Sequence, residues 1–208
     1  MICKTYWVSF STQIKQNFSS TNHIYYWKKM RIAQQKRKEN IAEYILYLYQ
    51  VENLIRAFQL DMGMINEHLI KKYDAEEEEA KNISEWYRNL TLMMEKEGKQ
   101  EKGHLQFLSN LLNELNEFHL RLLQSKTDQT YVQIYQAVTG LIAELKLKNP
   151  DAISEVQVAI DGVYGYLLLK IKQQDISSQT QEALKRLSQW LSYLSQRFKE
   201  YESGNVEF

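Results

Sequence analysis

The sequence predicts an all-α protein, a bundle of six or seven helices joined by short loops. Three observations predict this class. The 208 residues include 1 proline and 7 glycines, whereas an all-β chain of this length needs many turn residues. Apolar residues recur at spacings of three and four along most of the chain, which places them on one face of a helix. No stretch shows the strict apolar and polar alternation of a half-buried strand.

The first helix is expected to be one long amphipathic helix over residues 31–58. Ile41, Ile45, Leu48 and Ile55 follow one another at helical spacing and form its apolar seam. Its basic N-terminal part opposes the helix dipole at residue 36, so the helix is expected to begin earlier, near residue 31.

The next three helices are predicted from caps, charges and glycines. Asp61 is expected to cap the second helix, and the acidic run 74–79 is expected to form the exposed first turn of the third. Gly98 and Gly103 bracket a polar loop before the fourth helix, which ends at residues 125–128.

The fifth helix is expected to be continuous from Tyr131 to Leu145, because its apolar residues are spaced four, three, four, three. The sixth is expected to start at Asn149 and Pro150, with Asn as the cap and Pro in the first helical position.

Two further signals concern the last two helices. Gly162 and Gly165 interrupt the sixth helix and predict a tight helix crossing or a kink. Ser178 and Gln181 have the spacing of a capping box at the start of the seventh helix.

The composition predicts two parts. Residues 1–29 are rich in Ser, Thr, Asn and aromatics, and they are expected to be a weakly ordered N-terminal extension or a non-native upstream start. Residues 30–208 are expected to form a single helical-bundle domain. Basic residues outnumber acidic ones before Glu39, although the whole chain has a formal net charge of +0. Because the net charge is zero, the protein as a whole has no electrostatic attraction for nucleic acid or for anionic membranes.

The sequence also predicts a cytoplasmic protein with no membrane partner. Cys3 is the only cysteine, which excludes a disulfide within the chain and fits a reducing compartment. No apolar run approaches the ~20 residues that span a bilayer, and the N-terminus lacks the pattern of a secretory signal.

No catalytic residue, metal or cofactor is predicted. Glu101 and His104 match the Glu-x-x-His pattern of di-iron bundles, but such a site needs two of these motifs and two further carboxylates. A phosphate-binding glycine loop, a His-Glu-x-x-His motif and a nucleophile elbow are all missing from the sequence.

Glu52 is the least expected residue of the first helix, because it falls in the apolar seam. A buried carboxylate needs a partner or a proton, and Arg56 follows four residues later in the favourable order. Two interpretations stay open. The pair is an internal ion pair that fixes the helix register, or Tyr44, Glu52 and Arg56 line a polar pocket for a ligand.

A second face of the same helix carries a polar stripe. It is either solvated surface or a partner-binding strip. The stripe consists of Lys36, Asn40, Glu43 and Tyr47. Together with the possible pocket, it gives the candidate binding residues Asn40, Glu43, Tyr44, Tyr47, Glu52 and Arg56.

Two segments of this helix carry a family resemblance. They are IAQQKRKENIAEY at 32–44 and YQVENLIRA at 49–57. They resemble the opening of an uncharacterised family of Bacteroidetes-type bacterial proteins, described as a domain of unknown function. The resemblance implies an all-helical, cytoplasmic bacterial protein that starts near Met30. It implies no activity, cofactor or catalytic residue.

The predicted function is that of a non-enzymatic helical interaction or scaffold protein, whose partner is a second copy of the chain or another protein. One alternative is a small-ligand binder or enzyme with its pocket at Glu52 and Arg56. A second is a nucleic-acid-associated protein that uses the basic segment 28–38. The second is less favoured, because the basic cluster is short and no recognisable nucleic-acid module accompanies it.

Overall fold

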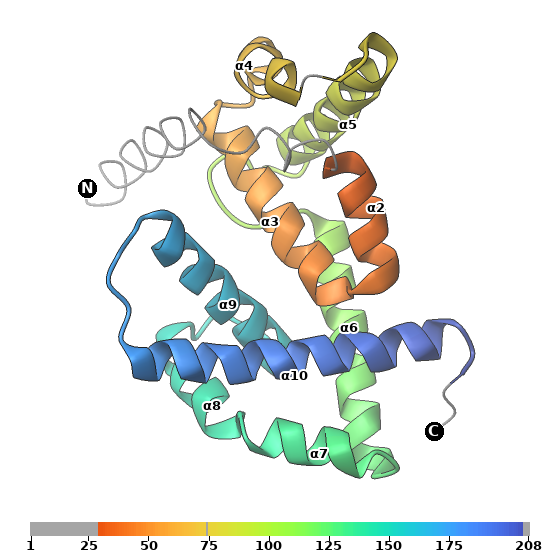
Figure 1. Cartoon of the computed structure of the whole chain (residues 1–208), viewed down its shortest axis with the longest axis vertical. Helices are drawn as coiled ribbons and strands as arrows, with labels where there is room; N and C mark the ends of the chain where they lie inside the picture. The colour runs from red at the N-terminus through yellow and green to blue at the C-terminus, as the bar shows by residue number, and fades with distance from the viewer. Residues whose placement is uncertain (1–28, 74, 206–208) are drawn as a thin grey trace. The chain divides into compact units, whose positions relative to one another are not determined.

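The computed structural model describes residues 29–73 and 75–205. These residues form helices and no strand, so the predicted all-α class is confirmed. The extension predicted for residues 1–29 falls outside the described residues, except for Lys29, where the first described helix begins. In order along the chain, the helices are α2 (Lys29–Glu39), α3 (Ile41–Ala57), α4 (Met62–His68), the 3-10 helix η1 (Ile70–Tyr73), α5 (Glu77–Lys96), α6 (Gln106–Ser125), α7 (Gln129–Gln136), α8 (Thr139–Lys148), α9 (Glu155–Ile171) and α10 (Ser178–Glu202) (Figure 1).

The described residues divide into two compact units. The first unit contains residues 29–34 and 47–106, and the second contains 35–46 and 107–205. The helix α3 therefore contributes its first residues to the second unit and its remainder to the first. The single domain predicted for 30–208 stays a prediction.

In the first unit, α4, η1 and α5 pack against one another. Asp61 caps α4 as predicted, since its carboxylate accepts hydrogen bonds from the backbone N–H groups of Gly63 and Met64. The apolar side of α5 is buried, and its Tyr87 hydroxyl lies 3.2 Å from that of Tyr73 in η1.

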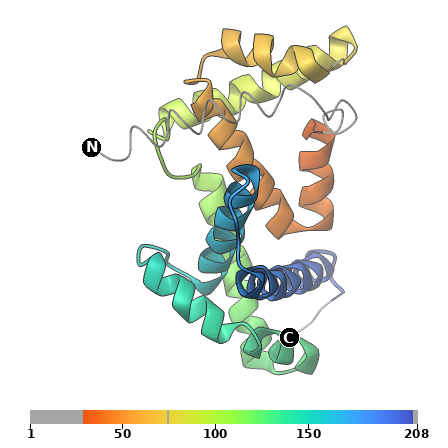
Figure 2. The same ribbon diagram turned by 60° about the vertical axis from the view of Figure 1, so that its left-hand side comes forward.

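In the second unit, α10 packs against α7 and α9, and α8 packs against α9 (Figures 1 and 2). The predicted three-four seams are buried in both long helices of this unit. The buried seam residues are Leu108, Leu112, Leu115 and Leu122 in α6, and Leu184, Leu187, Leu191, Leu194 and Phe198 in α10.

The prediction of one helix over 31–58 is wrong, because the chain leaves the helix at Asn40 and begins a new one at Ile41. The Asn40 side chain accepts a hydrogen bond from the Glu43 N–H at 3.1 Å, and its Nδ2 lies 3.4 Å from the Glu43 carboxylate. Asn40 is thus an N-cap of α3 without the reciprocal bond of a capping box, because the Asn40 N–H bonds to the Lys36 carbonyl at 2.7 Å. The Asn-x-x-Glu signal was present in the sequence.

The fifth predicted helix is also two helices, α7 and α8, which are separated at Ala137 and Val138. The Val138 N–H bonds to the Tyr135 carbonyl at 2.9 Å, which tightens the last turn of α7. Val138 and Ile142 are both buried, so the apolar spacing continues across the break and conceals it. The seven predicted helices thus correspond to nine α-helices in the described chain.

Two predicted caps lie elsewhere. Asn149 ends α8 instead of starting α9, whose N-cap is Ser154. Ser154 accepts a hydrogen bond from the Gln157 N–H at 3.2 Å. At α10 the cap is Ser177, one residue before the predicted Ser178. In both cases neighbouring residues offered equivalent cap signals.

The two glycines of α9 differ in their surroundings. A Cβ atom at Gly162 would lie 2.8 Å from a terminal methyl of Leu145 in α8, which confirms the predicted tight crossing at this position. A Cβ atom at Gly165 would meet nothing within 4 Å. Only at Gly162 would a Cβ atom force a neighbour, the end of the Leu145 side chain, to shift.

Candidate functional site

Glu52 lies in the first unit and its side chain is buried, with 1% of the residue exposed. One carboxylate oxygen accepts the backbone N–H of Leu105 at 2.9 Å, and the other lies 2.5 Å from Nδ1 of His104. The His104 ring stacks on Tyr49 with centroids 3.4 Å apart. Both oxygens of Glu52 are thus engaged by the end of the loop that joins α5 to α6.

Arg56 binds the same loop from the next turn of α3. Its Nε donates to the Lys99 carbonyl at 3.0 Å, and its Nη2 donates to the Gly103 carbonyl. Its Nη1 donates to the Asn53 side chain at 3.0 Å. Glu52 and Arg56 therefore form a loop clamp, which we define as these two side chains holding residues 99–105. The contacts give both residues a structural task that needs no ligand.

The remaining predicted binding residues divide between the units. Asn40, Glu43 and Tyr44 belong to the second unit, and Tyr47 belongs to the first with Glu52 and Arg56. Tyr47 is buried instead of lying on a solvated stripe, and burial raises the pKa of its phenol well above the usual value. Burial also raises the pKa of Tyr44, an effect that the nearby Arg37 opposes.

The basic segment pairs with carboxylates of its own chain. Lys36 forms an ion pair with Glu43. Arg37 donates from both terminal nitrogens to the two oxygens of Glu202 in α10, at 2.9 and 3.1 Å. This hydrogen bonding raises the pKa of Arg37 further. Two cations of the predicted nucleic-acid segment are therefore neutralised within the protein, which argues against that alternative.

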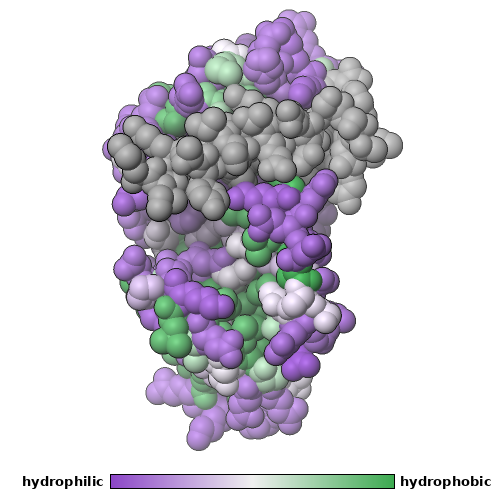
Figure 3. Space-filling model, turned by 90° about the vertical axis from the view of Figure 1, so that its left-hand side faces the viewer, coloured by the Kyte–Doolittle hydropathy of each residue, from purple (hydrophilic) through white to green (hydrophobic). Residues whose placement is uncertain are grey.

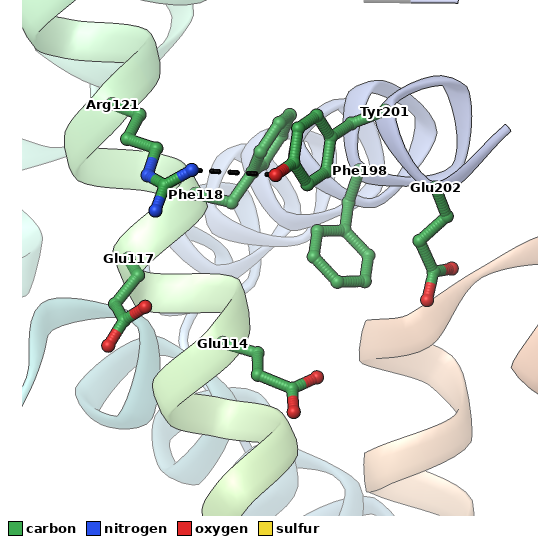
Figure 4. Close-up of a pocket in the computed structure, with 7 residues that line it drawn as sticks. All are labelled: Glu114, Glu117, Phe118, Arg121, Phe198, Tyr201 and Glu202. Atoms are coloured by element: carbon green, nitrogen blue, oxygen red, sulfur yellow. Dashed lines mark hydrogen bonds between the residues drawn. The ribbon is translucent and has the colours of Figure 1, made fainter. Parts of the chain in front are cut away.

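The second unit contains a half-open groove of about 270 Å³ between α6 and the end of α10 (Figure 4). We call it the α6/α10 groove. Its lining residues come from successive turns of α6 and from the last turns of α10. They are Glu114, Glu117, Phe118 and Arg121 in α6, and Phe198, Tyr201 and Glu202 in α10.

Aromatic rings form the floor of this groove. The centroid of Phe118 lies 5.4 Å from that of Phe198 and 5.1 Å from that of Tyr201. Phe118 and Phe198 are buried, whereas 37% of Tyr201 is exposed. Tyr201 is thus the ring that a bound group can touch.

Carboxylates form the rim. Among the described residues, Glu114 and Glu117 have no hydrogen-bond or ion-pair partner, and Glu202 is held by Arg37. Arg121 is turned toward α10, where its Nη1 lies 3.4 Å from the Tyr201 hydroxyl (Figure 4). Arg37 also feels the negative charge of Glu114, which helps to raise the pKa of Arg37. Three carboxylates therefore face two guanidinium groups, Arg37 and Arg121, and the remaining negative charge favours a cationic ligand.

This groove was not predicted from the sequence. No binding role was predicted from the sequence for Glu114, Glu117, Arg121 or Tyr201. Glu114, Glu117 and Arg121 are spaced three and four residues apart, which places them on one face of α6. The sequence did not indicate that this face packs against α10, because α10 lies about 80 residues later in the chain.

Apolar side chains are also exposed on the second unit. Leu147 at the end of α8 is 84% exposed, and Ile153 before α9 is 78% exposed. Figure 3 shows one face of the molecule, on which apolar side chains lie among polar ones.

No group of three or more His, Cys, Asp or Glu side chains in residues 29–73 and 75–205 could hold a metal ion. In the same residues, every helix is too short or too polar to cross a bilayer.

The chain belongs to the family described as Domain of unknown function (DUF4924), whose model matches residues 30–205. It is also similar to the chromosome partition protein Smc of Methanocaldococcus jannaschii, with 23% identity over 138 residues. That match covers 66% of this chain, but the chain spans only 11% of Smc. So low and partial a likeness assigns no function. No solved structure matches the chain.

Proposed function

We propose that the protein is a non-enzymatic interaction protein of the bacterial cytoplasm, and that it binds a basic segment of a partner protein in the α6/α10 groove. The observation that carries the proposal is that two carboxylates without a hydrogen-bond partner, Glu114 and Glu117, line the same groove as the exposed ring of Tyr201. The single cysteine supports the cytoplasmic location. The family resemblance supports the bacterial source.

A lysine or arginine side chain fits the chemistry of the groove. Its charged end would meet Glu114 or Glu117, and its aliphatic stem would cover the apolar floor. A cation over the face of Tyr201 would add a cation–π contact. The chain itself already places an arginine on the third carboxylate, since Arg37 binds Glu202 through two hydrogen bonds.

The expected energies limit how such a partner binds. Exposed ion pairs contribute about 0.2–1 kcal/mol each, and an exposed cation–π contact contributes about 0.5–1 kcal/mol. Two ion pairs and one such contact give at most about 3 kcal/mol, whereas a Kd of 1 mM requires about 4.1 kcal/mol. The partner segment must therefore touch more surface than the groove alone, and electrostatics supplies its orientation.

The test is an NMR titration of the isotope-labelled full chain with a synthetic peptide that contains two arginines separated by glycines. We expect the largest backbone shifts near Glu117 and Tyr201, and a loss of at least half of these shifts in Glu114→Gln/Glu117→Gln. The matched control is Glu144→Gln, which removes an exposed carboxylate from α8. Shifts spread evenly over the surface, or unchanged in the double variant, would overturn the proposal.

The other functions have weaker support. A ligand pocket or active site at Glu52 and Arg56 would have to displace the loop that both residues hold. Nucleic-acid binding through residues 28–38 would compete with the ion pairs of Lys36 and Arg37. Self-association is favoured by one observation, the exposure of Leu147 and Ile153. Light scattering that gives a strict monomer at high concentration would remove self-association.

A further inference from the structure

His119 is a fully buried histidine that the proposed binding function does not use. It lies on α6 with 1% of its surface exposed. Its Nδ1 lies 2.5 Å from the hydroxyl oxygen of Tyr131 in α7. Its Nε2 lies 3.5 Å from a carboxylate oxygen of Glu155, which is the first residue of α9. This second distance is long for a hydrogen bond.

The hydrogen-bond pattern and the burial of the ring together favour one protonation state. The indole Nε1–H of Trp190 in α10 can only donate, and it lies 3.2 Å from the Tyr131 oxygen. That oxygen accepts from Trp190, and because burial favours the neutral imidazole, its own proton is donated to Nδ1 of His119. Nδ1 is then an acceptor, so His119 is neutral and carries its proton on Nε2.

The same contacts connect four helices of the second unit. His119 belongs to α6, Tyr131 to α7, Glu155 to α9 and Trp190 to α10. The His119 ring also packs edge-on against Trp190, with centroids 5.3 Å apart. The hydrogen-bonded connection from Trp190 to His119 passes through the single hydroxyl of Tyr131, so this connection depends on Nδ1 being free of a proton.

The ionisable groups around His119 act in opposite directions. Burial lowers the pKa of His119, and the Glu155 carboxylate partly opposes this effect. Tyr135 of α7 packs against the ring at 4.9 Å and donates to Glu155 at 2.6 Å. Burial raises the pKa of both Tyr131 and Tyr135, so both stay neutral at physiological pH.

The charged groups beyond Tyr131 belong to a neighbouring network. Asp128, the N-cap of α7, accepts the Tyr131 backbone N–H at 2.9 Å. It also pairs with Arg197 of α10 at 3.0 Å and accepts the hydroxyl of Tyr193 at 3.3 Å. The α10 side of His119 itself contributes the uncharged indole of Trp190.

We propose that His119 is a proton-operated switch that links α6, α7 and α10 when neutral and releases the link when protonated. A proton on Nδ1 would face the Tyr131 O–H. That hydroxyl must then rotate and accept from both Trp190 and His119, and its own proton loses its acceptor. A buried donor without a partner is destabilising, so acid favours a looser packing of α10.

The direction of the pH effect follows from linkage. His119 has a lower pKa in the folded protein than its ordinary value of 6.5. Between these two values the unfolded chain binds more protons than the folded chain, so stability falls as the pH falls below about 6.5. For one group, the unfolding equilibrium constant can rise by up to tenfold per pH unit in that window.

The first test compares urea unfolding of the full chain and of His119→Gln between pH 7.5 and 5. We expect the wild-type unfolding constant to rise more steeply below pH 6.5 than that of His119→Gln. His68→Gln, at an exposed position of α4, is the control and should keep the wild-type slope. Equal slopes in all three proteins would overturn the proposal.

The second test does not depend on the stability of His119→Gln. Nitrogen-15 NMR of the histidine rings should show His119 as the Nε2–H tautomer at pH 7. In Tyr131→Phe the ring loses the donor to Nδ1, so His119 should titrate at a higher pH. Tyr193→Phe removes a hydroxyl that contacts Asp128, and it should leave the His119 midpoint unchanged. An Nδ1–H tautomer at pH 7, or the same midpoint in wild type and Tyr131→Phe, contradicts the switch.

Discussion

The carboxylate of Glu52 stabilises the fold because it accepts two hydrogen bonds from the loop after α5. Because Glu52 lies in an apolar seam, a leucine at this position would be expected to give a more stable protein. The hydrogen bonds of Glu52 lead to the opposite expectation. The backbone N–H of Leu105 is buried with Glu52 as its acceptor. An apolar residue at 52 would leave this donor without a partner in the interior.

Glu52→Leu is therefore expected to lower the free energy of unfolding by about 1–3 kcal/mol, the cost of one unsatisfied buried donor. Urea unfolding followed by circular dichroism measures this difference. The control Glu85→Leu makes the same substitution at an exposed position of α5, where the expected change is within about 0.5 kcal/mol. A Glu52→Leu protein as stable as wild type would show that the loop clamp does not need the carboxylate.

At the scale of single elements, the sequence predicted the buried faces of the helices but not all of their ends. The seam residues of α6 and α10 recur regularly, so their burial was readable from spacing alone. The break at Asn40 was concealed because residues 34–40 are all polar, so no apolar spacing marks where one helix ends and the next begins. A cap depends on two or three local hydrogen bonds, and several neighbouring residues can make them.

The cap at Asn40 gives a direct prediction. Asn40→Ala removes the acceptor for the Glu43 N–H and is expected to lower stability by about 1 kcal/mol. Thermal unfolding measures the change. Asn89→Ala, in the middle of α5 and exposed, should be neutral or slightly stabilising, because Ala has the higher helix propensity. Equal effects in the two variants would mean that Asn40 is not a cap.

The glycines of α9 give a matched pair within one helix. Gly165→Ala places its methyl group in open space and should raise the free energy of unfolding by about 0.5–1 kcal/mol. Gly162→Ala forces a methyl of Leu145 to move from 2.8 Å, so its gain should be smaller than that of Gly165→Ala. Chemical unfolding of both variants gives the comparison. A gain of the same size at both positions would refute the tight crossing of α8 and α9.

At the scale of the whole molecule, the all-α class followed from composition and spacing, whereas the candidate site did not. The α6/α10 groove and the His119 switch each join residues that lie far apart in the sequence. Phe118 and Tyr201 meet only because α6 and α10 pack together. The candidate residues chosen from one helix, such as Glu52 and Arg56, turned out to be held by the adjacent loop. Unusual residues were identifiable from the sequence, but their partners were not.

The net charge of the whole protein determines where selectivity for a basic partner can arise. The chain has a formal net charge of +0, so selectivity for a basic segment must come from the local field of Glu114 and Glu117 and not from the whole protein. Reversing these two charges should therefore reverse the preference for the partner. The same reversal elsewhere on the second unit should not.

The most direct measurement compares the binding of an arginine-containing peptide and its glutamate counterpart to wild type and to Glu114→Lys/Glu117→Lys at low salt. The account predicts that wild type binds the arginine peptide more tightly and that the double variant prefers the glutamate peptide. Glu144→Lys/Glu182→Lys has the same net charge change at exposed positions outside the groove and should keep the wild-type preference. If the two lysine variants behave alike, or if wild type binds both peptides equally, the groove is not the binding site.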